Sequence, residues 1–179
     1  MTPRYNFAMT AVRYLCAVLL LAGLPWGPVL AGKIPVAVDL QRDANISRAE
    51  RVPILLVYTT DYCHYCDEVK ASVFNLIFAD PTYQDRILLR EVRIDTNLDL
   101  VSFSGTVTSH RSFSKTRGIR IVPTLEFLDG AGTPISPPLV GASIPDYYGA
   151  YVDNGIEQSL RTLRTVSYTH LTLPTSNGV

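Results

Sequence analysis

The segment Ile54-Leu55-Leu56-Val57-Tyr58-Thr59-Thr60-Asp61-Tyr62-Cys63-His64-Tyr65-Cys66 decides the fold of this chain, because a short apolar run leads into two cysteines separated by two residues. The run 54–59 predicts a buried strand. After Cys66, apolar residues recur with a helical period until Asp80-Pro81, which predicts a helix that begins at the cysteines. A helix N-terminus stabilises the thiolate of the first cysteine, and the thiolate is the form that attacks disulfides. The order of strand, cysteine pair and helix therefore indicates a redox site.

Other uses of a cysteine pair fit less well. A structural zinc site would need a second pair of ligands, and the third cysteine, Cys16, lies in a segment that we expect to be removed. A c-type haem attachment site has histidine directly after the second cysteine, whereas this chain has Asp67. A purely structural disulfide stays open as an alternative.

The composition sets further limits. The 179 residues suffice for one domain by the usual range of about 100–200 residues. Lysine plus arginine and aspartate plus glutamate number 16 each, so the formal net charge is zero. This balance offers no basic field for nucleic acid, and we expect no nucleic-acid partner.

The N-terminus has the layout of a secretory signal peptide. Arg4 and Arg13 are followed by an apolar core at 15–24, a stretch with two prolines at 25–28 and a small-residue ending at 29–31. An uncleaved anchor is the alternative, but the core is shorter than the roughly 20 residues that span a bilayer. We expect cleavage after Ala31, export to the periplasm and no stable membrane insertion afterwards. The mature chain then keeps only Cys63 and Cys66, which in an oxidising compartment act as an oxidant or as a reductant that a partner keeps reduced.

The remaining elements follow from period and turn signals. We expect a leading helix in 32–53 and a second core strand at 87–95. A loop over 98–114 should run into a short helix that ends near Arg117-Gly118. A hairpin at 119–132 and a closing helix at 141–164 complete the predicted domain. Residues 165–179 have no helical period and resemble a translated sequencing-adapter tail. The predicted organisation is a signal peptide at 1–31, one domain at 32–164 and a non-native tail at 165–179.

Two motifs resemble thioredoxin: Val57 to Cys66, and Gly118-Ile119-Arg120-Ile121-Val122-Pro123-Thr124-Leu125-Glu126-Phe127-Leu128-Asp129. The resemblance covers about Val36 to Arg164. It implies an α/β, thioredoxin-like three-layer fold in which helices flank a central mixed β-sheet. The leading helix, the Phe103-Ser104-Gly105 stretch and the secretion signal look most similar to bacterial periplasmic thioredoxin-related proteins of the SoxW type.

The resemblance also implies roles for individual residues. Cys63 would be the attacking thiol and Cys66 the buried resolving thiol. Pro123 would be a cis-proline facing the disulfide, which leaves the Val122 backbone free to pair with an incoming peptide. We expect substrate binding by residues around these two motifs, namely Tyr62, Tyr65, Val122, Pro123 and Thr124; alternatively, the two tyrosines only pack near the helix start. The implied partners are protein disulfides and a membrane electron-transfer partner, with no cofactor and no metal.

Three positions depart from the thioredoxin pattern. The residues between the cysteines are His64 and Tyr65 instead of glycine and proline, the buried acid of the preceding strand falls on Val57, and its strand lysine falls on Glu91. We therefore expect Glu91 to be a buried carboxylate with a raised pKa that serves as general base for Cys66. The alternative is that Glu91 pairs at the surface with Arg93 or Arg120.

The histidines differ in their expected roles. His64 adjoins Cys63, and as an imidazolium it would favour the thiolate and make the disulfide more oxidising; alternatively it only faces solvent at the helix cap. His110 and His170 have no cysteine or carboxylate neighbours at ligand spacing, and we expect both to lie at the surface.

Together these observations predict a periplasmic thiol-disulfide oxidoreductase that reduces or exchanges protein disulfides through the dithiol of residues 63–66. A disulfide donor is the second hypothesis, and His64 favours it. A third hypothesis, from another class, is a redox-inactive thioredoxin-like module that holds a partner at the Val122-Pro123 edge.

Overall fold

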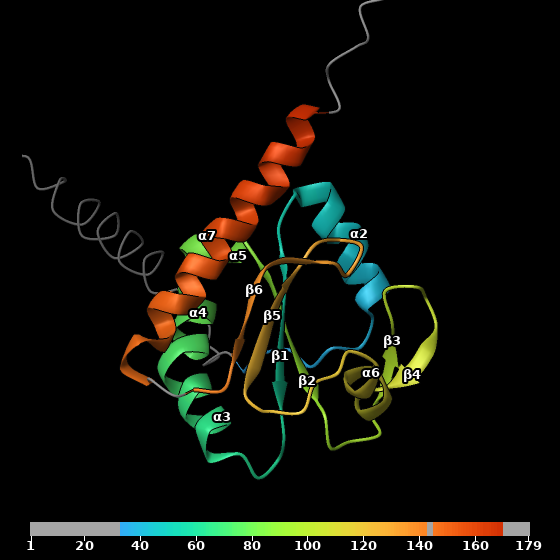
Figure 1. Ribbon diagram of the computed structural model, residues 1–179, viewed down its shortest axis with the longest axis vertical. Helices are drawn as coiled ribbons and strands as arrows, with labels where there is room; N and C mark the ends of the chain where they lie inside the picture. Colours follow the sequence, from blue (N-terminus) through green and yellow to red (C-terminus); the bar gives the residue numbers. More distant parts are fainter. Residues whose placement is uncertain (1–32, 143–144, 170–179) are drawn as a thin grey trace, which may run out of the picture. The chain divides into compact units, whose positions relative to one another are not determined.

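Four strands form the central sheet of the computed structural model, which describes residues 33–142 and 145–169 (Figure 1). In the order β2-β1-β5-β6, β2 is parallel to β1, whereas β5 is antiparallel to β1 and β6 to β5. The bounds are β1 (Ile54–Thr59), β2 (Leu88–Arg93), β5 (Thr124–Leu128) and β6 (Pro134–Val140). The predicted signal peptide, His170 and the end of the predicted tail lie outside the described residues.

Helices cover both faces of this sheet. The helical run after the cysteines and α7 (Pro145–Thr169) lie on one side, and α2 (Leu40–Glu50) and α6 (His110–Thr116) lie on the other (Figure 1). Alternate residues of β1 enter the two apolar clusters, Leu55 and Val57 with α7, and Leu56 and Tyr58 with α2. Because both faces are buried, β1 needs the continuous apolar run seen in the sequence. The predicted three-layer fold class is confirmed.

The helical run after the cysteines has three parts: α3 (His64–Val69), the π-helical turn η1 (Lys70–Phe74) and α4 (Asn75–Ala79). It ends where the sequence predicted, because Asp80 has extended backbone and caps the short α5 (Pro81–Gln84) through the Thr82 amide. The π-helical turn was not predicted. Such turns occur mostly as single insertions in α-helices, frequently at functional sites.

The segment expected to be a loop contains a hairpin. Strands β3 (Asp99–Val101) and β4 (Val107–Ser109) pair antiparallel and form a second, two-stranded sheet. Gly105 has a positive φ of 81° in the turn, and serine and threonine hydroxyls hydrogen-bond to one another across it. Strands of three residues are too short to display the two-residue alternation that marks a strand, so the sequence pattern missed them.

The closing helix is longer than predicted, because α7 continues to Thr169 instead of ending at Arg164. Arg164 and Thr165 are exposed in its final part. A solvated helical turn needs no apolar period, which explains why the sequence pattern ended early. In the ranges 33–142 and 145–169, no helix combines the length and apolar character required to cross a bilayer.

Candidate redox site

Cys63 and Cys66 form a disulfide at the start of α3, with their Cα atoms 5.1 Å apart. Cys63 has extended backbone at the N-cap position, and its sulfur accepts a hydrogen bond from the Cys66 amide at 3.1 Å. Cys63 is half-buried, whereas Cys66 is fully buried. In the reduced protein, the amide that meets the Cys63 sulfur and the helix N-terminus would both stabilise a thiolate there. This difference in exposure makes Cys63 the sulfur that a substrate can reach.

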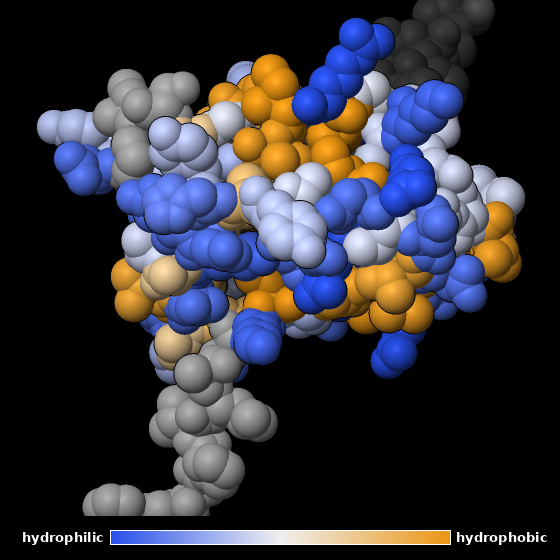
Figure 2. All heavy atoms as spheres, turned by 90° about the horizontal axis from the view of Figure 1, so that it is seen from below, coloured by the Kyte–Doolittle hydropathy of each residue, from blue (hydrophilic) through white to orange (hydrophobic). Residues whose placement is uncertain are grey.

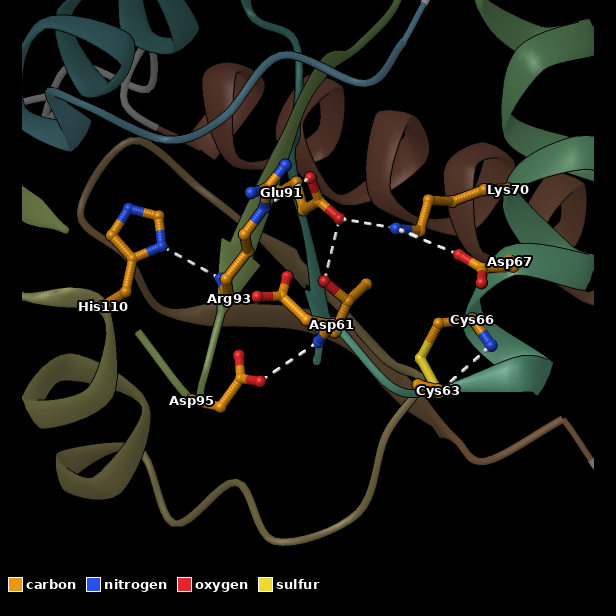
Figure 3. A network of polar contacts seen from close by, with 10 residues as sticks. Asp61, Cys63, Cys66, Asp67, Lys70, Glu91, Arg93, Asp95 and His110 are labelled. Atoms are coloured by element: carbon orange, nitrogen blue, oxygen red, sulfur yellow. Dashed lines mark hydrogen bonds and ion pairs between the residues drawn. A yellow bond between two sulfur atoms is a disulfide. The ribbon is translucent and has the colours of Figure 1, made fainter. Parts of the chain in front are cut away.

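The loop before Cys63 is fixed to the neighbouring strand, because the Asp61 amide donates to Asp95 Oδ2 at 3.1 Å (Figure 3). Tyr62, which follows Asp61, is fully exposed, and Tyr65 is 56% exposed. His64 is also exposed, and its ring centroid lies 5.9 Å from that of Tyr65. The end of the molecule that carries the start of α3 mixes hydrophobic and hydrophilic residues (Figure 2). The two tyrosines therefore present aromatic surface near the cysteines.

The loop before β5 lies at the same end of the sheet as the cysteines, because Thr124 is the register partner of Tyr58 near the end of β1. The Val122–Pro123 peptide bond is cis. Pro123 is buried, and its carbonyl accepts a hydrogen bond from the Gly141 amide at 2.7 Å.

The side chain of Thr124 supports this loop. It is buried, and its hydroxyl donates to the Ile121 carbonyl at 2.7 Å. Among the described residues, no backbone hydrogen bond involves Val122, whose side chain is half-buried. The Val122 backbone is thus available for pairing, whereas the Thr124 hydroxyl is already used within the protein.

Glu91 lies inside the protein, on the sheet face that α3 and η1 cover. Its register partner is Val57, and its side chain is 5% exposed. Figure 3 shows the Glu91 carboxylate between Lys70 and Arg93. Lys70 Nζ lies 2.9 Å from Oε1, Thr59 Oγ1 donates to Oε1 at 2.8 Å, and Arg93 Nε lies 3.4 Å from Oε2.

These contacts correct the prediction made for Glu91. Burial raises the pKa of this carboxyl, but the hydrogen bonds from Lys70 and Thr59 and the positive charges of Lys70 and Arg93 outweigh burial, so the pKa is lowered. The predicted raised pKa is therefore wrong, because the sequence did not reveal that a lysine from the helix would reach the carboxylate. The alternative of a surface pair is also wrong, because Glu91 is buried, although Arg93 does contact it. A carboxylate of lowered pKa is a weak proton acceptor at neutral pH.

Sequence reasoning missed Lys70, which occupies the fourth position after Cys66. The signal was present, since a lysine one helical turn after the second cysteine lies on the same helix face. Besides Glu91, its ammonium contacts Asp67, with Nζ 3.7 Å from Oδ1. Lys70 thereby connects the helix that carries Cys66 with the strand that carries Glu91.

The predicted surface position of His110 is wrong, because this residue is fully buried at the start of α6. Its Nδ1 accepts a hydrogen bond from the Arg93 amide at 2.9 Å, and its Nε2 lies 2.8 Å from the Ala37 carbonyl. A carbonyl can only accept, so Nε2 carries the proton. Both ring nitrogens are used within the protein, which gives His110 a structural role.

The chain is similar to a known domain family and to several solved structures. Residues 40–156 match the family model of the thioredoxin-like domain, and no curated protein matches the chain. Among solved structures, thioredoxin Mala s 13 from Malassezia sympodialis is 18% identical, with 72% of this chain and 92% of that chain covered and a TM-score of 0.49.

Two further solved structures are similar. For thioredoxin f from spinach chloroplast the identity is 20%, the coverage 72% of this chain and 96% of that chain, and the TM-score 0.45. The C-terminal domain of DsbD from Neisseria meningitidis in the oxidised form is 18% identical, with 67% of this chain and 98% of that chain covered and a TM-score of 0.42. The family model spans more than half of the chain and includes both cysteines and Pro123. The chain belongs to the thioredoxin-like domain family, and with its Cys63–Cys66 pair it is a thiol-disulfide oxidoreductase.

Proposed function

We propose that this protein is a periplasmic oxidoreductase that reduces or exchanges disulfides of other proteins through Cys63 and Cys66. The observation that carries the proposal is the unequal exposure of the two cysteine residues at the start of α3. One sulfur is open to a substrate and the other is enclosed, which suits a reaction with one intermolecular and one intramolecular step.

The reaction begins with the reduced pair. The Cys63 thiolate attacks one sulfur of a substrate disulfide, so that a Cys63–substrate disulfide forms and the first substrate sulfur leaves as a thiolate. Cys66, as a thiolate, then attacks the Cys63 sulfur; the Cys63–Cys66 bond forms, and the second substrate sulfur leaves with the electron pair of the broken bond. The substrate disulfide is thus reduced and the dithiol oxidised, while the protons from Cys63 and Cys66 pass to solvent and the substrate thiolates take up protons from it.

The surface around the cysteines supports a protein substrate. Tyr62 and Tyr65 provide accessible aromatic area, and Ile121 is 56% exposed beside the cis-proline loop. The Val122 backbone has no intramolecular hydrogen bond among the described residues, so an extended peptide can pair with it as a short added strand.

The periplasmic location rests on the sequence pattern of residues 1–31, and the SoxW-like assignment on the Phe103-Ser104-Gly105 stretch and this N-terminal pattern. A reductant in an oxidising compartment has to be reduced again after each turnover. We therefore include a membrane electron-transfer partner in the proposal. Fractionation of cells that express the full chain tests the location: recovery in the cytoplasm would contradict it.

A disulfide donor is the second candidate, because the exposed His64 directly follows Cys63. Equilibration of the purified protein with glutathione buffers separates the two directions. A reduction potential near −270 mV, that of thioredoxin, supports a reductant, and one near −120 mV, that of a strong periplasmic oxidant, supports a donor.

Two substitutions test the cysteine roles. We expect Cys63→Ser to abolish the reduction of insulin, and Cys66→Ser to accumulate a mixed disulfide with the substrate that non-reducing electrophoresis detects. In the full chain, which keeps residues 1–31, Cys16→Ser is the matched control and should leave insulin reduction unchanged. Insulin reduction by Cys63→Ser at the wild-type rate would contradict the assignment, and no turnover by the wild-type protein would favour the redox-inactive binding module.

A further inference from the structure

Lys70 lies one helical turn after Cys66, and its backbone amide donates to the Cys66 carbonyl. Side chains of a helix lean toward its N-terminus, so a residue at this position covers the turn that precedes it. The Lys70 side chain is 27% exposed, and its ammonium is directed into the protein, toward β2 (Figure 3). The ammonium therefore lies on the inner side of the helical run, and its residue stands one turn after the resolving cysteine.

Two cations and two carboxylates form the charged network around Lys70, and they differ in burial. From β2, Glu91 faces it at 2.9 Å, and Arg93 shares the same carboxylate, so two cations contact one buried anion. From its own helical run, Asp67 contributes a second carboxylate at 3.7 Å, but that side chain is 73% exposed. Water and salt screen an exposed charge more than a buried one. Arg93, at 39%, is more exposed than Lys70, at 27%, so the buried Glu91 carboxylate is shared between the two cations and does not neutralise Lys70 alone.

We propose that Lys70 is a positioning residue for the second half of the reaction, in which its ammonium stabilises the thiolate of Cys66 while Glu91 holds the ammonium in place. The proposal rests on the function proposed above. It replaces the role predicted for Glu91: the buried carboxylate, 2.9 Å from Lys70 Nζ, serves as the counter-ion of a lysine and takes no proton from Cys66.

The chemical step that Lys70 assists is the release of substrate. The Cys66 thiol loses its proton to solvent, its sulfur attacks Cys63, the Cys63–Cys66 bond forms, and the substrate sulfur leaves with the electrons of the broken bond. A nearby cation favours the thiolate and so raises the fraction of molecules that can react at neutral pH. The preceding attack by Cys63 does not use Cys66 and should be independent of Lys70.

Stopped-flow kinetics with a fluorescent disulfide peptide tests the proposal, because the attack depends on protein concentration and the release does not. All proteins are the full chain with Cys16→Ser, so that only Cys63 and Cys66 react. We expect Lys70→Met to slow release roughly tenfold at neutral pH and to shift its pH profile up by about one unit, with the attack rate unchanged. Lys70→Arg should restore the profile. Lys115→Met, which removes an exposed cation of α6, is the matched control and should behave like the wild type.

Glu91→Gln separates Lys70 from a general base. The amide oxygen of the glutamine can still accept the hydrogen bond that holds Lys70, whereas the negative charge that neutralises the ammonium is gone. We therefore expect faster release and a pH profile shifted downward, whereas loss of a general base would slow release. Slower release by Glu91→Gln, or wild-type release by Lys70→Met, would overturn the role of Lys70 while the mixed disulfide still forms. Absence of any mixed disulfide in the Cys66→Ser protein would overturn the proposed function and this inference together.

Discussion

Replacement of His110 by alanine should destabilise the fold strongly. The substitution leaves two buried backbone groups without partners, the Arg93 amide and the Ala37 carbonyl. An unsatisfied buried group costs about 1–3 kcal/mol, and the space left by the ring adds to this, so we expect a loss of roughly 3–5 kcal/mol. Such a loss is a large part of the typical total of about 5–15 kcal/mol.

The same residue makes stability depend on pH. Burial lowers the pKa of His110; the hydrogen bond to the Ala37 carbonyl and the charge of Glu91 oppose this effect, and the charge of Arg93 adds to it. A protonated ring would also direct a second N–H at the Arg93 amide, which is itself a donor. The folded chain therefore binds this proton less readily than the unfolded chain, whose histidine has a pKa of about 6.5.

It follows that stability is lost as the pH falls below about 6.5, and that the loss ends at the lowered folded pKa. Each pH unit between the folded and the unfolded pKa of His110 changes the free energy of unfolding by about 1.4 kcal/mol. Urea unfolding with the disulfide intact, followed by circular dichroism between pH 5 and 8, measures the free energy of unfolding for the wild type and His110→Ala. Titratable groups that the wild type and His110→Ala share cancel in the difference between their free energies of unfolding. The difference should shrink as the pH falls, and a constant difference across this range would refute the role assigned to His110.

Further predictions concern the redox site and the core. His64→Ala should raise the pH at which Cys63 is half-ionised by up to about one unit, and equal thiolate titrations at 240 nm in the two proteins would make His64 a surface residue only. Gly155→Ala should lower the melting temperature, because a Cβ there would lie 2.2 Å from Phe127 Cζ and overpacking of about 1–3 kcal/mol exceeds a helix-propensity gain of about 1 kcal/mol. Gly149→Ala, whose Cβ would meet only Val73 Cγ2 at 3.8 Å, is the matched control and should not destabilise; equal melting temperatures for the two alanine variants would contradict the packing argument.

The elements with strong local signals could be predicted from the sequence. The strand Ile54–Thr59 has the predicted bounds, because six consecutive buried positions require an unbroken apolar run. The end of the helical run at Ala79 was equally clear, since Asp80-Pro81 both stops one helix and caps the next. The β3–β4 hairpin was missed because its strands are short and its turn is rich in serine and threonine.

The polar contacts of the site could not be predicted in the same way, because they join residues that are distant in the sequence. Lys70 and Glu91 are separated by 21 positions, and His110 and Ala37 by 73. A pattern within a window of residues reveals neither which long side chain reaches which carboxylate nor whether a polar group is buried. His110 lacked sequence neighbours that would mark it as functional, yet the fold gives both of its ring nitrogens backbone partners.

Strand β2 connects these separate contacts into one argument about the site. The Glu91 backbone is held on the outer side of β2 by the leading segment, through hydrogen bonds to the Pro35 carbonyl and from the Ala37 amide. The Ala37 carbonyl in turn contacts His110, which also holds the Arg93 amide. The carboxylate that fixes Lys70 therefore projects from a strand whose outer edge is fully bonded at this point. The leading segment and His110 therefore support the part of β2 from which Glu91 contacts Lys70.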